Sequence, residues 1–267
     1  MILTLYFSGT GNTKYIAEQF SEKIDAKCLS IEEDANFTDE IKTHDTIAIC
    51  YPIYGSRVPL IMREFVTQHM GALKGKKLAI FVTQLIFSGD GARVLCDLFL
   101  PNHVQVIYAE HFLMPNNVCN FALLRQTSDR RMQKQLKIAD KKLNRICHDM
   151  SRSKIKKRGF GAFARFLGKF QGIPWQGDSR NSHAAPKTME YKAKHGVKIH
   201  PECTSCGICV HHCPMKNLEQ QGETITHKNN CTLCYRCINI CPQKAITVFF
   251  HARPKWQYKG IATDYTD

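Results

Sequence analysis

The sequence has no long hydrophobic run. No window approaches the roughly 18 uninterrupted apolar residues that a membrane-spanning helix requires, although 43% of the 267 residues are hydrophobic. The opening run from Met1 to Phe7 is too short for a signal peptide and lacks its flanking residues. We therefore expect a globular, cytoplasmic chain with no transmembrane segment.

Acidic residues are scarce in one part of the chain. Residues 151–195 hold 11 Lys and Arg but only 2 Asp and Glu, so this segment supplies most of the formal net charge of +14. Strand-like patterns stop here, which indicates a basic linker or docking segment. Because the excess charge is confined to one segment, we expect no nucleic-acid binding, and an acidic redox partner is the better explanation.

The same segment carries an apolar stripe at helical spacing, bordered by Arg165 and Lys169. Its members are Phe160, Phe163, Leu167 and Phe170. We expect the stripe to pack between two domains, in preference to a membrane or partner surface.

The first 150 residues alternate short apolar runs with longer amphipathic stretches. This pattern is typical of a parallel sheet covered by crossover helices, one of which begins near Thr13 and another of which falls within residues 121–150. Strands are expected at Ile2 to Phe7, Ala26 to Ile31, Thr46 to Tyr51, Leu78 to Thr83 and Val104 to Glu110. Five such strands predict a doubly wound α/β domain over residues 1–150.

Eight of the 13 cysteines form an internal repeat. Each half reads C-x2-C-x2-C-x3-C-P, the bacterial run for cubane iron-sulfur clusters, in which the fourth cysteine serves the other cluster. We therefore expect two 4Fe-4S clusters. The first would take Cys203, Cys206, Cys209 and Cys241, and the second would take Cys231, Cys234, Cys237 and Cys213.

Zinc is the main alternative for these cysteines. Tetrahedral zinc sites normally use two pairs of ligands separated by a spacer, so runs of four favour clusters. On this repeat, residues 198–250 resemble a bacterial-type ferredoxin with two 4Fe-4S clusters, and we place a small α+β domain at residues 196–250, followed by a C-terminal tail at 251–267. The resemblance implies one-electron transfer at low potential and sensitivity to oxygen.

A loop with two glycines lies between the first strand and the first helix. Hydroxyls, an amide side chain and free backbone N–H groups at a helix N-terminus form a cradle for a phosphate dianion. The loop residues are Ser8, Gly9, Thr10, Gly11, Asn12 and Thr13. The Gly-Lys-Ser/Thr ending of a Walker loop and the third glycine of a dinucleotide fingerprint are both missing, and a plain helix-capping turn is the alternative.

This loop resembles the flavodoxin signature T/S-x-T-G-x-T, which binds the phosphate of FMN, and the resemblance covers residues 1–150. It implies a flavodoxin-like five-stranded sheet whose third and fourth strands end in two loops that hold the isoalloxazine ring. The first loop has Pro52, Ile53, Tyr54 and Gly55; the second runs from Thr83 through Phe87, Ser88, Gly89 and Asp90. Tyr54 is expected to stack on the flavin, with a rim aromatic as the alternative.

The second loop departs from short-chain flavodoxins, which tend to carry another aromatic and an acidic cluster near the ring. Gln84, Leu85 and Ile86 occupy that stretch. A helix-entry turn capped by Asp90 is the alternative for its glycines.

Together the two halves are similar to the fused flavodoxin and ferredoxin family that occurs mainly in anaerobes. We expect electron transfer between the two clusters and a bound FMN within one chain, which exchanges electrons with a low-potential donor or acceptor protein. The alternative is a flavin-dependent reductase whose clusters feed FMN for the reduction of a small oxidant such as a quinone. Its substrate would lie near Met114, Pro115, Asn116 and Asn117. No pattern assigns an oligomeric state.

Overall fold

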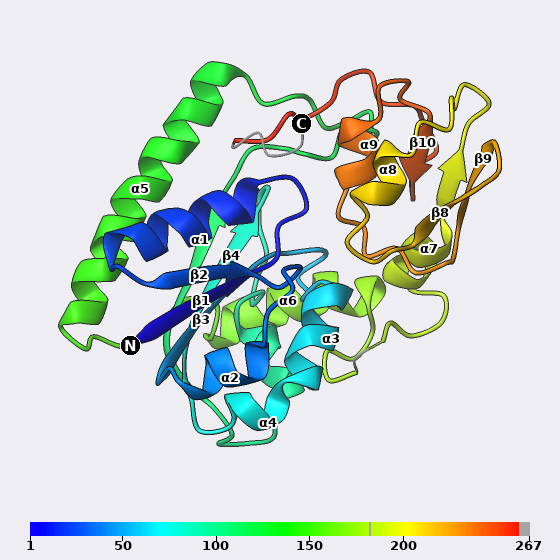
Figure 1. Cartoon of the computed structure of the whole chain (residues 1–267). Coiled ribbons are helices and arrows are strands. Elements are labelled where there is room, and N and C mark those ends of the chain that lie inside the picture. Colours follow the sequence, from blue (N-terminus) through cyan, green and yellow to red (C-terminus); the bar gives the residue numbers. More distant parts are fainter. Residues whose placement is uncertain (182, 262–267) are drawn as a thin grey trace.

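The computed structural model describes residues 1–181 and 183–261, so the end of the expected C-terminal tail lies outside the described residues. Its larger part is a parallel sheet with the strand order β2-β1-β3-β4-β5-β6 (Figure 1). The strands are β1 (Ile2–Tyr6), β2 (Lys27–Ser30), β3 (Thr46–Pro52), β4 (Lys77–Gln84), β5 (Gln105–Leu113) and β6 (Lys156–Lys157). All five expected strands are present, and the two-residue β6 extends the edge beside β5.

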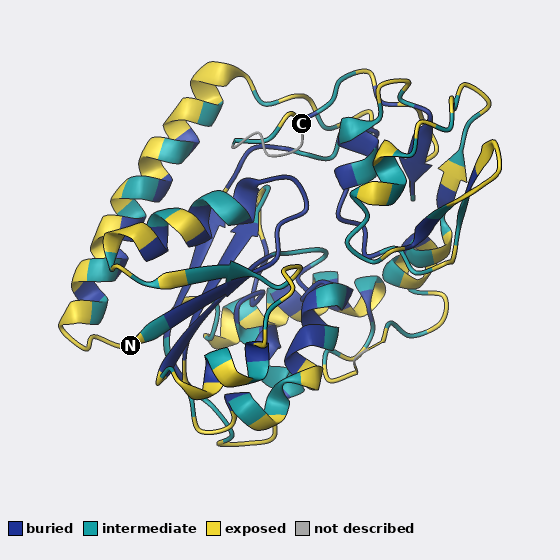
Figure 2. Ribbon diagram, in the orientation of Figure 1, coloured by how far each residue is buried: buried dark blue, intermediate teal, exposed yellow. Residues whose placement is uncertain are grey.

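Helices cover both faces of the sheet, so the strands are buried on both sides (Figure 2). One face packs on α1 (Asn12–Lys23) and α5 (Asp129–Ser151). The other packs on α2 (Phe37–Lys42), α3 (Leu60–Gln68), α4 (Met70–Leu73) and the 3-10 helix η1 (Arg93–Leu98). Alternate residues of β3 supply the two cores, which explains why its sequence is an almost continuous apolar run.

The strand order reverses at β1, which lies between β2 and β3. In a doubly wound sheet, the crevice at the carboxyl ends of the strands on either side of this point is the usual ligand site. The loop after β1 and the loop after β3 both end in this crevice.

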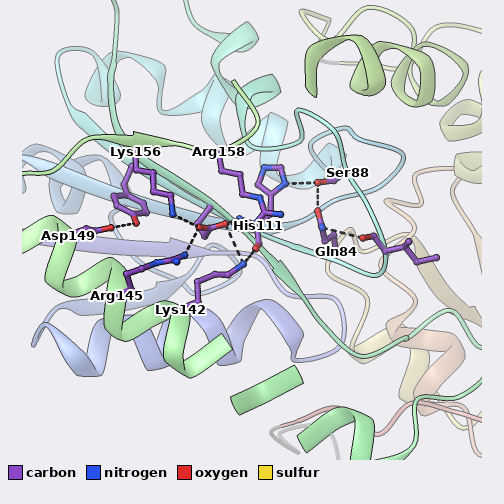
Figure 3. A network of polar contacts seen from close by, with 11 residues as sticks. Gln84, Ser88, His111, Lys142, Arg145, Asp149, Lys156 and Arg158 are labelled. Atoms are coloured by element: carbon purple, nitrogen blue, oxygen red, sulfur yellow. Dashed lines mark hydrogen bonds and ion pairs between the residues drawn. The ribbon is translucent and has the colours of Figure 1, made fainter. Parts of the chain in front are cut away.

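The basic segment 151–195 is more structured than a linker. It contributes β6, α6 (Ala162–Trp175) and α7 (Met189–His195). Its start is held by Glu110 of β5: Arg158 donates to this carboxylate at 2.9 Å, and Lys156 lies 3.4 Å from it. Lys142 of α5 lies 3.4 Å from the same carboxylate, and Figure 3 labels these three cations. Burial alone would raise the pKa of Glu110, but the N–H of His111 and the surrounding cations lower it, so the carboxylate stays charged.

The apolar stripe on α6 does not pack between domains, contrary to the expectation. Phe163 and Phe170 are 75% and 76% exposed, whereas Phe160 packs against the core of the sheet. The physical reason is that α6 docks through its glycines, Gly168 and Gly172, which are buried.

The C-terminal part is a small α+β unit built on the cysteine repeat. β7 (Val197–Ile199) pairs with β10 (Ile246–Val248), and β8 (Leu218–Gln221) pairs with β9 (Thr224–His227), both antiparallel. The short helices α8 (Ile208–His211) and α9 (Arg236–Ile240) lie within the two cysteine runs, and each contains the third cysteine of its run. Among the described residues, no helix has the length and apolar character needed to cross a bilayer.

Candidate functional site

The loop after β1 turns sharply into α1. Gly11, the N-cap of α1, has a φ of 92°, and no side chain caps the helix. The Ser8 hydroxyl accepts from the Gly11 N–H at 3.1 Å, and the Thr13 and Thr83 hydroxyls lie 2.7 Å apart. The first N–H groups of a helix have no partner within the helix, and Asn12 and Thr13 at this end line the crevice, so the end suits a phosphate dianion.

A cavity of about 440 Å³ opens beside this loop. It brings together most of the residues expected to hold FMN: Ser8, Gly9, Thr10, Asn12, Thr13, Pro52, Ile53, Tyr54, Gly55 and Thr83. Gln84, Leu85, Met114, Pro115 and Asn117 also line it. The three elements that the flavodoxin resemblance names for phosphate and ring therefore converge on one mainly apolar cavity.

Five of the expected residues do not line this cavity. They are Gly11, which is the N-cap of α1, and Phe87, Ser88, Gly89 and Asp90. Ser88 lies 2.9 Å from Nδ1 of the buried His111 (Figure 3), and a Cβ at Gly89 would come within 2.6 Å of the Gly168 backbone nitrogen in α6. The chain leaves the cavity after Leu85 because the rest of this loop packs against α6.

The outer wall of the cavity comes from residues that the sequence motifs do not assign to the flavin site. Its members are Trp175, Met189, Leu233, Tyr235, Phe249 and Phe250, with Phe121 from the loop after β5. Phe121 and Phe250 stack with ring centroids 4.5 Å apart. A Cβ at Gly55 would meet the Trp175 ring at 2.3 Å, so the indole covers the loop after β3 directly. The sequence signal that could have indicated this wall is the aromatic pair Phe249 and Phe250, directly after β10.

The Tyr54 hydroxyl is a buried polar atom with no hydrogen-bond partner among the described residues. Burial raises its pKa well above the ordinary value of 10, and the nearby thiol of Cys234 raises it further. A buried hydroxyl of this kind requires a partner. The apolar walls, this hydroxyl and the open helix end fit FMN, with the phosphate at Ser8 to Thr13 and the ring beside Tyr54.

The cysteines of the repeat line two separate cavities. Cys203, Cys206, Cys209 and Cys241 line one, and Cys213, Cys231, Cys234 and Cys237 line the other. Burial, followed by the charges of the Cys241, Cys203 and Cys206 thiols, raises the pKa of Cys209 to about 11, which reflects the same grouping. Each cavity thus contains three cysteines of one run and the fourth cysteine of the other run, as the motif predicts.

Backbone N–H groups point at the sulfurs with the same two-fold symmetry. The N–H groups of Ser205 and Leu233 donate to Cys203 and Cys231 at 3.4 and 3.3 Å. Those of Asn217 and Ala245 donate to Cys213 and Cys241, each at 3.3 Å. Such bonds stabilise thiolate charge and tune iron-sulfur clusters.

The donor set of each cavity fits a cluster. In the described ranges, no three His, Cys, Asp or Glu side chains close on a single metal ion. Thiols spread around a cavity wall, each run supplying three, suit a cubane whose iron atoms occupy separate corners.

The phosphate loop and the second cysteine loop touch. A Cβ at Gly9 would lie 2.3 Å from the carbonyl oxygen of Cys234, so only glycine permits this approach. The buried Arg236, next to this loop, donates to the carbonyls of Ser8 and Gly9 at 2.8 and 3.1 Å. It also forms two 2.7 Å bonds with Glu32.

Known proteins resemble the two halves separately. The family described as a flavodoxin domain matches residues 3–144, and the family described as a 4Fe-4S dicluster domain matches residues 202–246. A flavodoxin of Megasphaera elsdenii is 32% identical over an alignment of 87 residues. The match covers 30% of this chain and 63% of the relative, so the chain spans less than two thirds of that curated relative.

Solved flavodoxin structures resemble about half of the chain. The two-electron reduced flavodoxin of Megasphaera elsdenii is 25% identical, with a TM-score of 0.37, and covers 53% of this chain and 99% of its own. Oxidised flavodoxin 1 of Bacillus cereus is 16% identical, with a TM-score of 0.35, and covers 54% and 97%.

Proposed function

Because the chain belongs to the flavodoxin domain family and also carries a 4Fe-4S dicluster domain, we propose that it transfers electrons between two 4Fe-4S clusters and one FMN held in the same molecule. The two domains together make it an electron-transfer protein that uses flavin and iron-sulfur chemistry. When bound, the clusters supply one-electron transfer and FMN supplies two-electron transfer.

One observation carries the proposal. Tyr235 lines both the cavity beside the phosphate loop and the second four-cysteine cavity. Its backbone is in the left-handed region, with φ 62°, a conformation that a bulky residue adopts only when its surroundings enforce it. Because Tyr235 lines both cavities, they are neighbours, which supports electron exchange inside the chain.

The number of clusters is supported by the crossed grouping of the cysteines. Each cavity has a full set of four thiols, and the left-handed residues also repeat in pairs: Ser205 with Leu233, Gly207 with Tyr235, and Lys216 with Lys244. A single cluster would use only one of the two four-cysteine groups.

The first cysteine group is more accessible than the second. Trp175, Phe249 and Phe250 line the flavin cavity, which stays partly open to solvent. Cys206 is exposed, whereas Cys234 is buried. We therefore place the exchange with a redox partner protein at the first cluster, and the second cluster between it and FMN.

Anaerobic reconstitution tests the cofactor content of the full chain. The proposal requires about eight iron, about eight sulfide and about one FMN per chain. Cys206→Ala and Cys234→Ala should each lose about four iron, because each removes a ligand of a different cluster. The control Cys147→Ala, outside the repeat, should keep the full content.

Two results would contradict the proposal. Two zinc ions with no flavin would remove both redox groups, and about four iron in the intact chain would reduce the clusters to one.

A further inference from the structure

The helix α6 presents a row of large apolar side chains to solvent. Phe163, Phe166, Phe170 and Ile173 are 75%, 66%, 76% and 57% exposed. At about 100° per residue they fall within an arc of about 80°, so they form one continuous ridge along the helix. Four such residues in a row are too many for the scattered surface apolar residues of ordinary proteins.

The ridge cannot turn inward, because on the opposite side of α6 the backbone at two glycines lies directly against other side chains. A Cβ at Gly168 would lie 1.6 Å from Oδ1 of Asp90, and one at Gly172 would lie 2.0 Å from the guanidinium carbon of Arg57. Arg57 also donates to the Gly168 carbonyl at 3.4 Å. The glycine face of α6 is thus packed against Asp90 and Arg57, and the face with the phenylalanines lies toward solvent.

Basic residues are frequent in and before α6, and three of them, Lys154, Lys156 and Arg158, are already paired with Asp149 or Glu110. Residues 151–177 contain seven Lys and Arg and no Asp or Glu. Arg165 and Lys169 are exposed and border the ridge on α6 itself. Another exposed apolar residue, Ile155, lies within the basic run that precedes the helix and is 59% exposed.

We propose that α6 and the basic run before it dock this protein onto the surface of an anionic phospholipid bilayer. Aromatic and aliphatic side chains on one face of a short helix, next to cations, enter the boundary between head groups and acyl chains, while the cations meet the lipid phosphates. The convex ridge suits a deformable bilayer. A specific protein interface needs roughly 20 to 30 residues on each side, many more than the four of this ridge.

Vesicle sedimentation with the full, cofactor-loaded chain tests the proposal. Wild-type protein should bind vesicles containing roughly 30% phosphatidylglycerol at least tenfold more tightly than pure phosphatidylcholine vesicles, and the binding should weaken when salt rises from about 0.05 M to about 0.5 M. The double variant Phe163→Ser/Phe170→Ser should bind at least tenfold more weakly. These side chains are exposed, so unchanged circular dichroism is expected for the variant.

Matched controls distinguish binding through the ridge from nonspecific binding through any exposed apolar or basic side chain. Leu123→Ser, which alters a residue that is 82% exposed elsewhere, should bind like wild type. Arg165→Gln/Lys169→Gln should weaken binding several-fold, whereas Lys134→Gln/Lys137→Gln, on exposed positions of α5, should not.

Three results would overturn the proposal. They are no binding to the anionic vesicles, equal binding by the ridge variant, or a solution dimer that the ridge variant abolishes, which would assign the ridge to a second copy. Vesicle binding does not depend on electron exchange, so it can fail or succeed independently of the proposed function.

Discussion

Removal of the Arg236 guanidinium should uncouple the phosphate loop from the second cysteine loop. Arg236 is buried and forms two 2.7 Å bonds with Glu32, besides the bonds to the carbonyls of Ser8 and Gly9. Arg236→Met keeps much of the apolar stem and deletes every one of these bonds. Glu32, whose side chain is 22% exposed, then loses its cation, and the two loop carbonyls lose their donors.

The expected cost follows from this arrangement. Loss of one partner from a buried ion pair costs about 3 to 5 kcal/mol, because the other charge stays without compensation. The control is Arg253→Met in the C-terminal tail, which removes a 2.5 Å pair with Glu202 and the hydrogen bonds to the carbonyls of Gln243 and Lys244; the two paired side chains are 42% and 50% exposed. Exposed pairs contribute about 0 to 1 kcal/mol.

The assay is anaerobic urea unfolding of the cofactor-loaded chain, monitored through flavin fluorescence and cluster absorbance. Arg236→Met should release flavin at a clearly lower urea concentration than Arg253→Met or wild type. A cycle with Glu32→Gln should show that most of the Arg236 effect disappears when Glu32 is already neutral. If Arg236→Met unfolds within about 1 kcal/mol of wild type, the buried contact does not hold the two loops together.

Two further predictions concern single positions. Gly9→Ala should weaken FMN binding at least tenfold, because the new Cβ would lie 2.3 Å from the carbonyl oxygen of Cys234. In the control Gly71→Ala, the new Cβ would have no neighbour within 4 Å. Equal flavin dissociation constants for the two variants would refute this prediction. Burial lowers the pKa of His111 from 6.5 to about 4, so the folded chain binds fewer protons than the unfolded chain between these values. The stability that this neutral ring provides is complete above about pH 6.5 and is lost as the pH falls toward 4, at about 1.4 kcal/mol per pH unit within that window. Urea titrations at pH 7 and about 5.5 should show a shallower loss for His111→Gln, and parallel losses would contradict the assignment.

Local patterns were sufficient for the strands and for the cysteine repeat. Continuous apolar runs such as Thr46–Pro52 predict strands buried on both faces, and the observed β3 is such a strand. The crossed grouping of the thiols followed from spacing alone, because the backbone turns at Ser205 and Leu233 repeat with the sequence. Short-range geometry therefore determined these features.

Long-range packing decided what local patterns did not predict. The cover of the flavin cavity joins Trp175 and Phe249, which lie far along the chain from the phosphate loop. The orientation of α6 was predicted wrongly because hydrophobic periodicity ignores glycine, whereas Gly168 permits the closest approach to the body of the protein. A helix that packs through its small face leaves its large side chains outside.

The most direct measurement follows electrons within one molecule. The oxygen-protected, fully loaded chain is mixed rapidly with a low-potential one-electron donor, and flavin and cluster absorbances are recorded over a range of protein concentrations. We predict that the clusters are reduced first and that the flavin then follows at a rate independent of protein concentration, because the two cavities share Tyr235. A flavin rate that rises in proportion to protein concentration, or a flavin that is never reduced by the clusters, would contradict it.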